Sequence, residues 1–102
     1  MGQILENGYE MKTTFWQDFT IADLFGLDAV QQTYNNAFKE WKKDTVYITE
    51  LALVVNWKCW QHYNKNNMAM YELYHDLYYK TRDWCLNHLK GKDLKYYIDT
   101  TD

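Results

Sequence analysis

Residues 46–64 read "VYITELALVVNWKCWQHYN", and their pattern decides the fold class of this chain. The middle of the segment, Leu51–Val55, is apolar on every side, which is typical of a helix enclosed by other helices. This apolar run is far shorter than the roughly 20 residues that a membrane-spanning helix needs. We therefore expect residues 46–64 to form the central helix of a soluble bundle.

Apolar residues recur at helical spacing on both sides of this segment. They predict helices over residues 14–25, 28–43 and 68–89, with one or two more turns in "KDLKYYI", residues 92–98. The composition of "NKNN", residues 64–67, indicates a turn, so the helices on either side of it should pair as a hairpin. The chain contains no proline, the strongest helix breaker. The predicted fold is an all-α, small antiparallel bundle of four to five helices with a long central helical hairpin.

Details of the first two predicted helices follow from the same spacing. In the first helix Phe15, Phe19, Ala22 and Phe25 share one face, which we expect to be buried. Asp28 stands where an N-cap residue of the second helix is expected, because its short side chain can accept a free backbone N–H.

The N-terminal residues 1–13 lack a helical period and contain two glycines, so we expect a loose arm there and a single helical domain over residues 14–102. They also lack the basic start and the apolar run of a signal peptide, which favours a cytoplasmic protein without a membrane segment. Cys59 and Cys85 should lie about 16 Å apart along the hairpin, at 1.5 Å rise per residue, which is too far for a disulfide. We expect both to be reduced and buried.

Residues 19–41, "FTIADLFGLDAVQQTYNNAFKEW", resemble a DNA-reading helix-turn-helix. The first 28 residues, however, hold five acidic residues and one lysine, and the whole chain has a formal charge of −3. Because phosphate contacts supply most of the affinity for nucleic acid, we expect no nucleic-acid partner. A DNA-binding accessory factor that uses this segment stays the alternative, together with a metal-dependent one.

The metal alternative depends on Glu72 and His75, whose Glu-x-x-His spacing is half of a ferritin-like di-iron motif. His62 should lie close to them across the hairpin, so three zinc ligands are conceivable, although a polar network with nearby tyrosines explains the same residues. Glu50, in a largely apolar segment, fits either a general acid or a favourable position in the first turns of its helix. The chain has no serine and no glycine-rich phosphate loop, so we expect neither an enzyme nor a cofactor.

Aromatic residues make up 19% of the chain, more than one inward stripe of a small bundle can enclose. Tyrosine and tryptophan are favoured at protein interfaces, so part of this set should contact a partner protein or a second copy of the chain. The predicted partner-binding residues lie in the half of the hairpin next to its turn: Trp57, Trp60, Tyr63, Tyr71, Tyr74 and Tyr78.

Four segments, "FWQDFTIADLFG", "TYNNAFKEW", "YITELALVVNWKCWQHY" and "LKGKDLKYYIDTTD", resemble a small uncharacterised family that phages and mobile elements of Firmicutes-type bacteria encode. The resemblance covers nearly the whole chain after the N-terminal arm. It implies an accessory protein of a mobile element, acting on host machinery or host defence, and it transfers no catalytic residues.

Overall fold

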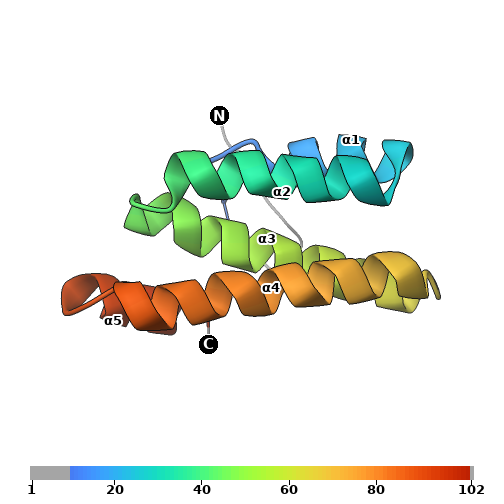
Figure 1. The fold of residues 1–102 in the computed structure, drawn as a ribbon. Coiled ribbons are helices and arrows are strands. Elements are labelled where there is room, and N and C mark those ends of the chain that lie inside the picture. Colours follow the sequence, from blue (N-terminus) through green and yellow to red (C-terminus); the bar gives the residue numbers. More distant parts are fainter. Residues whose placement is uncertain (1–9, 102) are drawn as a thin grey trace.

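The computed structural model describes residues 10–101, and within this range the chain forms five α-helices (Figure 1). Their bounds are α1 (Phe15–Phe25), α2 (Leu27–Trp41), α3 (Thr45–Asn64), α4 (Met68–His88) and α5 (Lys92–Thr101). The predicted all-α bundle with its central hairpin is confirmed. None of the helices in residues 10–101 is long and apolar enough to cross a membrane.

The hairpin of α3 and α4 is the frame of the bundle, and its two helices form the most extensive interhelical contact. The hairpin of α1 and α2 lies along one side of this frame, and α5 lies on the opposite side, at the end where α4 finishes (Figure 1). Helix α3 contacts each of the other four helices. All five residues of Leu51–Val55 are buried, which agrees with the expectation of a central helix.

Turn chemistry explains where the hairpin helices begin. The side chain of Asp44 accepts a hydrogen bond from the backbone N–H of Tyr47 and caps α3, and Asn67 accepts one from Met70 and caps α4. The predicted cap at Asp28 is wrong. Helix α2 already begins at Leu27, because α1 and α2 are joined by Gly26 alone, at a φ of 113° that favours glycine.

The prediction of a loose arm is wrong for residues 11–13. Met11 is 2% exposed, and the backbone N–H groups of Lys12 and Thr13 donate hydrogen bonds of 2.8 Å and 2.7 Å to the carboxylate of Glu50. The hydroxyl of Thr13 donates to the same carboxylate. Glu50 lies in the second turn of α3 and is fully buried, so it fixes the chain that leads into α1. The remainder of the predicted arm, residues 1–9, lies outside the described residues.

The inner face predicted for α1 is correct for Phe15, Phe19 and Ala22 but wrong for Phe25. Phe25 is 79% exposed, because it is the last residue of α1 and the chain reverses directly after it. Between α2 and α4, the buried hydroxyl of Tyr34 lies 2.7 Å from that of Thr81. Burial raises the pKa of Tyr34 to about 12.

Candidate protein-binding surface

Five side chains form a continuous surface where α3 and α4 approach their turn. This aromatic surface consists of Trp60 and Tyr63 on α3 and of Tyr71, His75 and Tyr79 on α4. The ring of Trp60 lies 5.5 Å from that of Tyr63 and 6.0 Å from that of Tyr71, and the two tyrosine rings lie 5.2 Å apart. Along α4, His75 lies 5.5 Å from Tyr71 and 4.7 Å from Tyr79. At these separations aromatic rings attract one another beyond the effect of burial.

The ring contacts order these side chains without burying them. Trp60 is 49% exposed, Tyr63 and Tyr79 are each 47% exposed, and Tyr71 and His75 are half-buried. All five are held on two regular helices of the frame. Such ordered, half-exposed aromatic groups lose little side-chain freedom when another surface covers them, which favours binding.

Three of the six predicted partner-binding residues belong to this surface: Trp60, Tyr63 and Tyr71. Trp57 and Tyr78 are half-buried and pack against the core, and the Tyr78 ring lies 5.6 Å from the Tyr79 ring at the edge of the surface. His75 and Tyr79 were not predicted. Their spacing of four and eight residues from Tyr71 on one helix places them on its face, and this signal was available in the sequence.

Tyr74 was predicted to contact a partner, and this is wrong. It is fully buried, and its hydroxyl donates a 2.6 Å hydrogen bond to Oδ1 of Asp23 on α1. Its ring meets the edge of Phe19 at 5.7 Å and stacks on His62 at 5.4 Å. Burial and the carboxylate of Asp23 raise the pKa of the Tyr74 hydroxyl far above its ordinary value. Tyr74 is therefore a core residue that connects α4 to α1.

The carboxylate of Asp23 gathers a buried polar cluster behind the aromatic surface. Its Oδ2 atom lies 3.1 Å from Nζ of Lys58 and 3.0 Å from Nε2 of His62. The Lys58 side chain is only 2% exposed, and its ammonium also lies 4.5 Å from the centre of the Trp16 ring. Burial lowers the pKa of Lys58, while the Asp23 carboxylate opposes this shift. The cluster connects α1 to the part of α3 next to the hairpin turn through hydrogen bonds to a charged group, which are stronger than neutral ones.

The possible metal site does not come together. His62 faces Asp23 and stacks on Tyr74, whereas His75 lies in the aromatic surface and Glu72 is exposed. Across residues 10–101, no three His, Cys, Asp or Glu side chains are grouped so that they could hold a metal ion. A polar network does form around His62, but its members are Asp23 and Tyr74 and not the expected Tyr63 or Tyr71.

Cys59 and Cys85 are both free and buried, as expected. Burial raises the pKa of the Cys59 thiol to about 11 and that of the Cys85 thiol to about 12. A reactive cysteine needs a lowered pKa and access to solvent, so these thiols have the character of core side chains.

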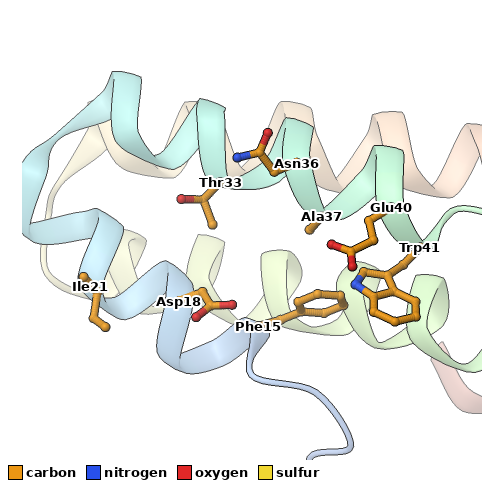
Figure 2. A pocket seen from close by; sticks show the side chains of 8 residues that line it. All are labelled: Phe15, Asp18, Ile21, Thr33, Asn36, Ala37, Glu40 and Trp41. Carbon is orange, nitrogen blue, oxygen red and sulfur yellow. The ribbon is translucent and has the colours of Figure 1, made fainter.

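A hollow of about 330 Å³ lies between α1 and α2 (Figure 2). Phe15 and Asp18 of α1 lie on the side of Ala37, Glu40 and Trp41 of α2 (Figure 2). Ile21, Thr33 and Asn36 complete its lining. Both carboxylates belong to exposed residues, and Asp18 accepts a hydrogen bond from the hydroxyl of Thr14.

The helix-turn-helix alternative can be compared with the geometry of α1 and α2. The two helices lie side by side as a tight hairpin (Figure 1), and Val30 and Tyr34 of α2 face the core. The exposed side of α2 presents Asp28, Gln32 and Asn35, and its first basic residue is Lys39. The expectation that this segment does not read DNA stays a prediction.

The corner between α1 and α2 carries an apolar patch that sequence reasoning missed. Leu24 is 83% exposed, Phe25 79%, Ile21 50% and Leu27 45%. The four residues lie at the end of α1 and the start of α2, on either side of Gly26, where the chain reverses. Phe25 is the one aromatic residue among these four, and within residues 10–101 the patch lacks the ring contacts that connect the aromatic surface.

Comparison with protein families, with curated proteins and with solved structures finds no match to this chain. The resemblance to a phage-encoded family therefore stays a prediction.

Proposed function

We propose that this protein is a non-enzymatic protein-binding module that contacts its partner through the aromatic surface. The observation that carries the proposal is the chain of ring contacts from Trp60 to Tyr79, in which three of the five side chains stay close to half exposed. Exposed apolar clusters on soluble proteins commonly mark sites of interaction. The polar rims of tryptophan and tyrosine make such a surface compatible with water before the partner binds.

The chemistry of the buried groups supports binding rather than catalysis. The cluster around Asp23 is occupied by mutual hydrogen bonds, and the two thiols are buried with raised pKa values. These groups stabilise the frame on which the aromatic surface is displayed. The resemblance to mobile-element proteins makes a host protein one candidate partner, and a second copy of this chain is the other.

The experiment compares capture by the full chain and by two groups of variants. Tyr63→Ala and Tyr79→Ala shorten exposed members of the aromatic surface, and Leu24→Ala shortens an exposed residue of the α1–α2 corner as the control. Each variant is first shown by circular dichroism to fold, and is then used both as bait in lysate and in light scattering at increasing concentration. We expect both tyrosine variants to lose a captured partner protein that the control keeps, and Tyr79→Ala, which lies on α4, to lose self-association as well. Equal binding by all three variants would refute the proposal.

A further inference from the structure

The outer side of α4 carries a stripe of residues at the spacing of a coiled-coil seam. Counting from Met68, the stripe continues at steps of four, three, four, three and four residues: Met68, Glu72, His75, Tyr79, Arg82 and Leu86. This alternation keeps all six positions on one face of a helix and is the pattern by which two helices pack side by side. In Figure 1, α4 runs along the front of the bundle with its outer side free of the other drawn helices.

The apolar members of this stripe are exposed although they are large. Met68 is 43% exposed, Tyr79 47% and Leu86 39%. These three side chains do not pack into the core, because α4 buries a different face, which includes Tyr74 and Leu77. The stripe is therefore a second, outward face of α4, on which apolar and charged residues alternate with rings, and it shares His75 and Tyr79 with the aromatic surface.

The stripe is complementary to itself when it is read in the opposite direction. If two copies of α4 lie antiparallel around a two-fold axis between His75 and Tyr79, Met68 meets Leu86 of the other copy. Glu72 then meets Arg82, and His75 meets Tyr79. The seam of the pair thus has apolar contacts at both ends, a pair of opposite charges next to each end, and aromatic rings at its centre. Two-fold symmetry repeats each of these contacts, as a closed dimer requires.

The charges in this arrangement are available. Glu72 and Arg82 are both exposed, and among residues 10–101 neither takes part in an ion pair. An antiparallel register that is shifted by one heptad would lose the match between these charges, so the charges also select the register.

We propose that this protein pairs with a second copy of itself through α4, in the antiparallel arrangement centred between His75 and Tyr79. This inference rests on the proposed function and names the partner. The seam is about 27 Å long, from 18 steps of 1.5 Å, and about 10 Å wide. It covers about 300 Å² per chain, less than the about 800 Å² per partner that stable complexes bury, so the dimer is a weak one.

Charge reversal provides the test. In Glu72→Arg, two arginines face each other twice in the homodimer, and in Arg82→Glu two glutamates do so. When the two variants are mixed, every facing pair is again of opposite charge. The variants Glu40→Arg and Lys39→Glu carry the same charge changes to exposed positions of α2 and serve as controls.

Sedimentation equilibrium is run from about 10 µM to 1 mM chain, the range in which a weak interface is populated. We expect the wild type and both controls to dimerise, each α4 variant alone to dimerise at least tenfold more weakly, and the equimolar mixture to regain the wild-type strength. A wild type that stays monomeric, or α4 variants that dimerise as strongly as the wild type, would overturn the pairing. If the pairing is overturned but capture of another protein still depends on Tyr63, the proposed binding function holds. If that capture does not depend on Tyr63 either, the proposed binding function is refuted as well.

Discussion

Replacement of Asp23 by alanine tests how the frame is held together. The carboxylate accepts hydrogen bonds from Tyr74 and Lys58 and faces His62, and the ammonium of Lys58 is almost completely buried. Without Asp23, Lys58 is left as an unpaired buried charge, and such a loss costs about 3–5 kcal/mol. For a domain of this size, each kcal/mol lowers the melting temperature by about 4–8 °C, so we expect a fall of more than about 12 °C.

Urea denaturation at pH 7 measures this change, with the double variant Asp23→Ala/Lys58→Met as the matched control. Methionine keeps the aliphatic volume of Lys58 and removes the charge, so the double variant should recover at least half of the lost free energy of unfolding. If Asp23→Ala costs less than about 1 kcal/mol, or if the second substitution makes the loss larger, the buried cluster does not stabilise the fold in the way described.

Two further predictions test burial. Phe25→Ala should change the free energy of unfolding by less than about 0.5 kcal/mol because Phe25 is exposed, whereas Phe19→Ala should cost about 3–5 kcal/mol; equal effects in thermal melts would contradict the observed corner. Alkaline pH should destabilise the fold, because the pKa values of Cys59 and Cys85 are raised from 9.0 to about 11 and about 12. Their contribution is complete below pH 9 and is lost as the pH rises through the folded pKa values, at about 1.4 kcal/mol per pH unit for each thiol. The lowered pKa of Lys58 opposes part of this loss. A urea midpoint in the presence of a reductant that is the same at pH 8 and pH 10.5 would refute this.

The helices were predictable because their signals are local. An apolar middle placed α3 at the centre, and the asparagine-rich turn placed α4 beside it. Capping was harder to predict, since Gly26 alone can reverse the chain and so moved the start of α2 ahead of Asp28.

The burial of single aromatic residues depends on partners that are distant in the sequence. Tyr71 and Tyr74 lie three positions apart in similar sequence surroundings, yet only Tyr74 is fully buried. Its hydroxyl donates a hydrogen bond to Asp23, which lies 51 residues away in the sequence. Lys12 and Thr13 are held for the same kind of reason, because a glutamate 38 and 37 residues further on accepts hydrogen bonds from their backbone N–H groups. Spacing along one helix can assign a face, but it cannot say which face another helix will cover.

Binding by Trp60→Ala shows directly whether the aromatic surface is the binding site. Trp60 is half exposed, and within residues 10–101 its ring contacts are with Tyr63 and Tyr71 of the aromatic surface. If the aromatic surface is the binding site, the variant should bind a partner protein at least about 30-fold more weakly, which corresponds to about 2 kcal/mol, while its melting temperature falls by only a few degrees. A variant that binds with the wild-type affinity but melts far earlier would show that Trp60 serves the fold, and would contradict the account.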